Sequence, residues 1–65
     1  MQLTVNGETI ERDGPLTLQQ LLDALRPGGR VAVLVNDAVV SGPARAALML
    51  KAGDRIEILT FAGGG

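Results

Sequence analysis

The feature that most constrains this chain is one stripe of leucines with helical spacing. The leucines recur at positions i, i+3, i+4 and i+7 and are Leu18, Leu21, Leu22 and Leu25. This is the pattern of a single apolar helix face. Thr17 is a favourable N-cap, Gln20 completes a capping box with it, and Pro27-Gly28-Gly29 ends the helix. One short helix covers only one face of a small sheet, so the pattern predicts a second face without a helix.

The segments before the helix predict a β-hairpin. Residues Gln2 to Val5 alternate polar and apolar, with the two apolar side chains inward. Asn6-Gly7 follows, and both residues tolerate the positive φ of a type I′ turn. Glu8 to Arg12 returns as a second strand with charged side chains outward, which suits the edge of a sheet.

The segments after the helix predict three more strands. Val31 to Val35 is apolar on both faces, as expected for a central strand. Asn36-Asp37 makes a turn into a short strand, Ala38 to Ser41. Ala44 to Leu50 has helix-compatible composition but no good cap, which favours either a short turn or a single helical turn, with Leu48 and Leu50 directed into the core. A tight turn over residues 51–54 then starts the last strand.

The last strand breaks its own alternation. Ile56 and Ile58 share one face, and Arg55 and Glu57 share the other, where water is expected. Leu59 and Phe61 then fall on the face of Arg55 and Glu57. If the valines of the central strand face the helix, one bare face gathers Ala32, Leu34, Leu59 and Phe61. A patch of that kind predicts a docking face for a partner, with Leu34, Leu59 and Phe61 as its main residues.

The order β-β-α-β-β-β predicts an α+β fold, a mixed sheet with one main helix packed across one face. Sixty-five residues leave room for one domain only. We expect the domain to span residues 1–62 and a flexible glycine tail to span residues 63–65, ending in the carboxylate of Gly65.

Composition excludes several classes of function. A net charge of −1 and a single aromatic residue argue against nucleic-acid binding. The chain has no Cys and no His, which removes thiol catalysis, disulfides, the usual zinc sites and His-based acid–base chemistry. No metal site, cofactor or catalytic residue is predicted. The apolar runs are too short to span a bilayer, and Met1 leads directly into a strand pattern. The expectation is therefore a cytoplasmic protein that is not an enzyme.

Three short stretches occur in a specific order and spacing: Val33-Leu34-Val35-Asn36, Gly53-Asp54-Arg55 before the last strand, and the terminal Gly64-Gly65. With them, the sequence resembles the ThiS/MoaD family of β-grasp, ubiquitin-like sulfur carriers along its whole length. Within the family, the 65-residue length, the compact loops and the extra Gly63 resemble the thiamine-pathway branch more than the molybdopterin branch.

The resemblance implies a protein that acts as a substrate. An adenylating enzyme would dock on the bare sheet face, take Gly63 and Gly64 into its active site, and join the Gly65 carboxylate to AMP. Sulfur derived from a cysteine desulfurase would replace AMP and leave a thiocarboxylate. A thiazole synthase would then accept the sulfur for the thiazole ring of thiamine.

Three alternatives stay open at the level of sequence. The sulfur could go to another pathway, namely molybdopterin, cysteine formation or tRNA thiolation. The chain could be a ubiquitin-like modifier that forms isopeptide bonds through Gly65, since the activated intermediate is the same. It could also be a passive interaction module that uses the same sheet face, with an inert tail.

Overall fold

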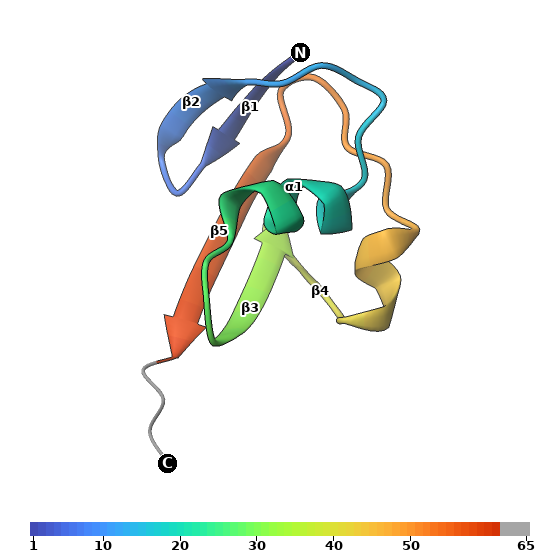
Figure 1. Cartoon of the computed structure of the whole chain (residues 1–65). Coiled ribbons are helices and arrows are strands. Elements are labelled where there is room, and N and C mark those ends of the chain that lie inside the picture. The colour runs from blue at the N-terminus through green and yellow to red at the C-terminus, as the bar shows by residue number, and fades with distance from the viewer. Residues whose placement is uncertain (62–65) are drawn as a thin grey trace.

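The computed structural model describes residues 1–61 and contains the predicted series of elements (Figure 1). The elements are β1 (Gln2–Val5), β2 (Glu8–Glu11), α1 (Leu18–Leu25), β3 (Arg30–Val35), β4 (Ala38–Val40), the 3-10 helix η1 (Pro43–Ala46) and β5 (Arg55–Phe61). The strands end within one or two residues of their predicted limits. The expected tail, residues 63–65, and its boundary at residue 62 lie outside the described residues.

One five-stranded sheet in the order β2-β1-β5-β3-β4 forms the body of the molecule. β5 is central, parallel to β1 and antiparallel to β3, and the two hairpins β1–β2 and β3–β4 flank it. α1 crosses one face of this sheet (Figure 1). The arrangement confirms the predicted α+β, β-grasp fold.

The helix begins and ends where its local chemistry dictates. The Thr17 hydroxyl accepts a hydrogen bond from the Gln20 N–H at 3.1 Å, and the Thr17 N–H donates to the Gln20 side chain at 2.9 Å, which completes the predicted capping box. At the other end Arg26 adopts the left-handed conformation, with φ 48°. Pro27 disfavours a helical residue before it, so the helix stops at Leu25, just ahead of the predicted Pro27-Gly28-Gly29 terminator.

The core lies between α1 and the covered face of the sheet. Its buried side chains come from the helix, from alternate strand positions and from the segment before β5, and they are Leu3, Leu18, Leu21, Leu22, Val33, Val35, Leu50, Ile56 and Ile58. Leu25 and Leu48 are half-buried against this cluster. The predicted leucine stripe is thus the core-facing side of the helix, and burial of these apolar side chains is the main stabilising term for a domain of this size.

The segment between β4 and β5 forms a single helical turn, one of the two predicted forms, and then runs past the start of α1. The Leu18 N–H donates to the Leu48 oxygen at 2.9 Å, and the Leu50 N–H donates to the Leu16 oxygen at 2.8 Å. These two bonds hold the segment against the helix N-terminus, and Leu50 enters the core as predicted.

Candidate docking face

The two faces of β5 have opposite exposure, as the sequence predicts. Ile56 and Ile58 lie under the helix and are 1% and 8% exposed, whereas Leu59 and Phe61 are 51% and 57% exposed. We call the side of the sheet away from α1 the open face. The alternation of a strand puts Leu59 and Phe61 there together with Arg55 and Glu57.

The strand register gathers further apolar side chains on the open face. Leu59 is opposite Ala32 of β3. Leu34, two residues after Ala32 and on the same face, is opposite Glu57. Leu34 is in turn opposite Val39 of β4. We define the apolar patch as Ala32, Leu34, Val39, Leu59 and Phe61. Ala32 and Leu34 are half-buried. The more exposed side chains of Leu59, Phe61 and Val39 flank them in the patch.

Val39 is the patch residue that sequence reasoning missed. It is 76% exposed, more than any other large apolar residue among residues 1–61. The signal was available, because alternation along Ala38–Val40 puts Val39 and Val40 on opposite faces. Val40 packs against the core, so Val39 must point to the open face. The short length of β4 obscured this.

The other half of the open face is polar. Thr4 of β1 aligns with Arg55 and is opposite Thr9 of β2. The Arg55 guanidinium donates to the Asp37 carboxylate at 2.9 Å, and this hydrogen bond and the ion pair raise the pKa of Arg55, a group that is protonated at neutral pH in any case. The predicted apolar patch is therefore confined to β3, β4 and the C-terminal half of β5.

The start of β5 is held by a buried carboxylate. Asp54 is 8% exposed; its two oxygens accept hydrogen bonds from the Lys51 N–H at 2.7 Å and from the Asn36 side chain at 2.9 Å. The sequence predicted a turn residue at Asp54, and the Asp54 N–H does close the turn on the Lys51 oxygen at 3.0 Å. Because all these contacts are internal, Asp54 has a structural role at the end of the strand distant from Phe61.

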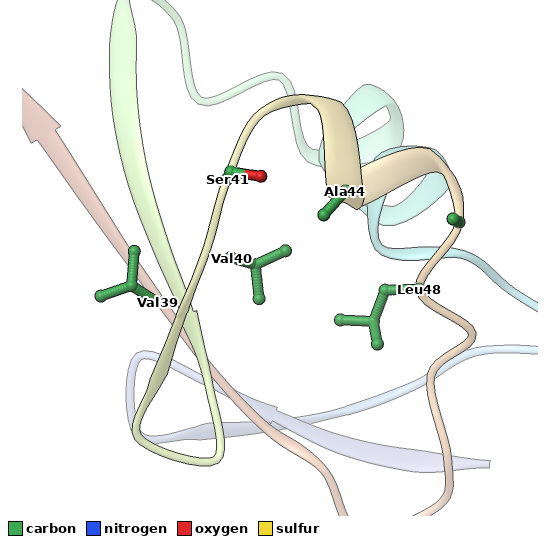
Figure 2. A pocket seen from close by; sticks show the side chains of 6 residues that line it. Val39, Val40, Ser41, Ala44 and Leu48 are labelled. Atoms are coloured by element: carbon green, nitrogen blue, oxygen red, sulfur yellow. The ribbon is translucent and has the colours of Figure 1, made fainter.

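A shallow apolar groove lies at the β4 edge of the sheet, between β4 and η1 (Figure 2). Val40, Ala44 and Leu48 point toward it, and Val39 points away from it (Figure 2). The groove encloses about 490 Å³, and Ser41 is its only polar lining residue. None of its lining residues is titratable at neutral pH.

The part of the chain that the structure describes holds no cluster of three or more His, Cys, Asp or Glu side chains placed to bind a metal ion. Across residues 1–61, no helix has the length and apolar character needed to cross a membrane. The predicted site residues Leu34, Leu59 and Phe61 do lie on one face. Gly63, Gly64 and Gly65 lie outside the described residues, and the roles assigned to all six stay predictions.

Comparisons with known proteins agree with this geometry. No curated protein sequence matches the chain. A crystal structure of the thiamine biosynthesis protein ThiS from Geobacter metallireducens is 40% identical, with a TM-score of 0.84 and full coverage of both chains. An NMR structure of a thiamine biosynthesis protein from Geobacter metallireducens is 39% identical, with a TM-score of 0.81 over 100% of this chain and 88% of that one. The family model for ThiS matches residues 3–65, and the chain therefore belongs to the ThiS family.

Proposed function

We propose that this protein is a sulfur carrier for thiamine biosynthesis and that it carries sulfur on the carboxyl group of Gly65. The observation that carries the proposal is the ThiS family match, which extends through the glycine run to residue 65. The apolar patch supports it, because its last member, Phe61, is only four residues from Gly65 in the sequence. In this proposal the chain is a substrate of other enzymes.

The chemistry explains why activation is needed. A terminal carboxylate has a pKa of about 3.3–3.7 and is anionic at neutral pH, which makes its carbon a poor electrophile. An adenylating enzyme would use ATP to form an acyl-adenylate at Gly65 and release pyrophosphate. The outer sulfur of a persulfide, derived from a cysteine desulfurase, would then attack the carbonyl carbon; the C–O bond to AMP breaks, and AMP leaves with the bonding electrons. A thiol reductant would cleave the S–S bond of the acyl disulfide that forms, the thiol being oxidised to a disulfide, and a thiocarboxylate remains.

The glycine run suits entry into an enzyme active site. Gly63 and Gly64 have no side chains and adopt almost any backbone conformation, so they can pass through a narrow channel without steric conflict. The four residues after Phe61 reach roughly 14 Å when extended. This distance would let an enzyme hold the apolar patch on its surface while Gly65 reaches buried catalytic groups.

Docking through the apolar patch would supply the free energy that ordering the glycine run costs. Leu59 and Phe61 are about half exposed, so a complementary apolar surface can still remove a large part of each side chain from water. We propose the same face for both partners in turn, the ThiF/MoeB-like adenylating enzyme and the thiazole synthase that accepts the sulfur in the cytoplasm. Nothing in the proposal requires a nucleic acid, a membrane or a cofactor on this chain.

The absence of cysteine allows a direct test. The chain would be incubated with the adenylating enzyme, ATP and a sulfur donor, then treated with iodoacetamide and weighed by intact-mass spectrometry. Because the sequence contains no Cys, an alkylated product reports a new sulfur nucleophile. Alkylation also separates a thiocarboxylate from oxidation of Met1 or Met49, which adds nearly the same mass as exchange of oxygen for sulfur.

The matched control is a variant that lacks Gly65. Alkylation of the full chain and not of the shortened one, with a dependence on ATP, is the expected result. Addition of thiazole synthase should then consume the alkylatable species. A chain that binds the adenylating enzyme but never becomes alkylatable would contradict the sulfur-carrier function, and a covalent adduct with lysines of other proteins would indicate a protein modifier instead.

A further inference from the structure

The side chain of Asn6 reaches across the sheet to the last strand. Its oxygen accepts a hydrogen bond from the Ile58 N–H at 2.7 Å, and its nitrogen donates to the Ile58 oxygen at 3.2 Å. Asn6 and Ile58 are 52 residues apart in sequence. A single carboxamide thus satisfies both backbone groups of one residue in β5.

The position of these bonds shows what the carboxamide replaces. β1 and β5 are joined as parallel strands through Thr4 N–H to Asp54 oxygen at 3.0 Å and Asn6 N–H to Ile56 oxygen at 2.9 Å. In a parallel ladder the next bonds would come from backbone groups of residues 6 and 8. The chain has instead turned away at Gly7. The carboxamide has one acceptor and a donor, like a peptide unit, and it adds one more rung to the ladder.

This rung lies where β5 extends beyond the end of β1, while β3 continues beside it. Figure 1 shows the turn between β1 and β2 partway along β5. Beyond Ile58, the only strand that pairs with β5 among residues 1–61 is β3, as far as the pair Arg30 and Phe61. Among residues 1–61, Asn6 therefore makes the last hydrogen bonds to β5 from the β1 side. They come just before Leu59–Phe61, the segment that contributes Leu59 and Phe61 to the apolar patch and leads toward Gly65 in the sequence.

The turn itself does not require a carboxamide. Asn6 has φ 49° and Gly7 has φ 84°, the type I′ conformation, and glycine adopts positive φ at least as readily as asparagine. A glycine at residue 6 would preserve the turn and lose both bonds to Ile58. Turn geometry and the bonds to β5 are thus separable by substitution.

The second hairpin provides a matched residue. Asn36 also lies at the first position of a tight turn, with φ 50°. Its oxygen accepts from the Arg55 N–H at 3.0 Å and its nitrogen donates to the Asp54 carboxylate at 2.9 Å. Asn6 and Asn36 therefore bind β5 with the same group, Asn6 at the middle residue of the strand, just before Leu59, and Asn36 at its first residue.

We propose that Asn6 is a positioning residue for the activation of Gly65. By fixing the backbone of Ile58, its carboxamide sets the direction in which Leu59–Phe61 continues along β3 beyond the end of β1, and so aligns the apolar patch with the chain that must enter the adenylating enzyme. This inference rests on the proposed function. Asn36 holds the start of β5 and has no such effect on the other end.

The test compares Asn6→Gly with Asn36→Gly in two measurements. Hydrogen exchange of backbone amides, followed by NMR, should rise about fivefold to tenfold at Ile58 in Asn6→Gly, the factor that one or two neutral hydrogen bonds supply. In Asn36→Gly the rise should be limited to Arg55 and its neighbours. ATP–pyrophosphate exchange with the adenylating enzyme should then show a kcat/KM about fivefold lower for Asn6→Gly, mainly through kcat if the carboxyl group is misdirected after docking.

Equal kcat/KM values for the two variants, or unchanged exchange at Ile58 in Asn6→Gly, would overturn the inference. If Asn6→Gly does not fold, Asn6→Asp replaces it. Aspartate tolerates positive φ and keeps the acceptor for the Ile58 N–H, but it loses the donor to the Ile58 oxygen. A kcat/KM for Asn6→Asp that is lower than both the wild-type and the Asn36→Gly values would support the proposal. A kcat/KM that lies between those two values would count against it. Hydrogen exchange needs no enzyme, so failure of the wild-type chain to be adenylated would contradict the proposed function alone.

Discussion

The two faces of β5 use the same kind of side chain for different purposes. On the covered face, Ile56 and Ile58 are almost completely buried against the helix. On the open face, Leu59 and Phe61 remain about half exposed, although they are as apolar as the isoleucines. The contrast teaches that apolar content alone does not identify a core residue. Which face the residue occupies, and whether an element covers that face, decides the outcome.

The difference follows from the number of elements available. One helix of eight residues covers one face, and the sheet has no second layer among residues 1–61. On the open face the chain then places polar residues over β1 and β2 and apolar residues over β3, β4 and the end of β5. Exposed apolar groups gathered on one half of a face are typical of a binding surface, and this patch adjoins the segment that leads to Gly65.

The largest effect on stability should come from the covered face. Leu22 is 5% exposed, and Leu22→Ala should lower the free energy of unfolding by about 2–5 kcal/mol, because truncation leaves a cavity in a small core. Urea denaturation would measure the loss. The matched control is Leu59→Ala, the same truncation on the open face, which should cost about 1 kcal/mol or less.

Equal losses for these two leucine variants would contradict the comparison between the faces. A small loss for Leu22→Ala alone would mean that the helix packs less tightly than its buried leucines indicate. A large loss for Leu59→Ala would mean that the open face is covered in solution, for instance by a second copy of the chain, and analytical ultracentrifugation would detect that copy.

The open face should give the largest effect on partner binding. Phe61→Asp places a charge in the apolar patch, where docking would have to desolvate it, so affinity for the adenylating enzyme should fall by at least tenfold. The midpoint of thermal unfolding should change little, because Phe61 is 57% exposed. Isothermal titration calorimetry with the adenylating enzyme would measure the binding. A large loss of thermal stability would show that Phe61 has a packing role, against our assignment.

Much of this contrast was predictable from sequence because it depends on local periodicity. The period-two alternation of β5 puts Ile56 and Ile58 opposite Leu59 and Phe61, and the capping box fixes where the helix begins. These are short-range rules that the chain obeys without knowledge of its neighbours. The strand faces and the position of the helix followed from them.

Long-range contacts were not predictable in the same way. Asn6 and Asn36 appeared as turn residues only. Each is a residue type that tolerates positive φ and stands between two predicted strands, which indicates a turn but not a hydrogen bond to a strand many residues away. Their bonds to Ile58 and Arg55 depend on the sheet order and register, which bring both turns to β5. Val39 was missed for a different reason: the alternation that puts it opposite Val40 is local, but a strand of three residues shows too little of that alternation to be noticed.

A smaller effect should define the limit of the patch on β4. Val39→Thr keeps the β-branched shape and replaces one methyl group with a hydroxyl, so the strand should form as before and stability should change by about 0.5 kcal/mol or less. If Val39 belongs to the docking face, affinity for the adenylating enzyme should fall by about threefold to fourfold, the worth of one buried methyl group. Unchanged affinity would restrict the docking face to β3 and β5.

The smallest effect is expected on the polar half of the open face. Asp37→Asn removes the ion pair with Arg55 and keeps a side chain that tolerates the φ of 70° at this position. Both partners of the pair are well exposed, so water and salt screen their attraction. The urea midpoint and the affinity for the adenylating enzyme should both stay within error of the wild type. A loss of affinity comparable to that of Phe61→Asp would instead extend the docking face across Arg55. The polar half would then orient the partner by charge, and the boundary that we draw between the two halves of the open face would be wrong.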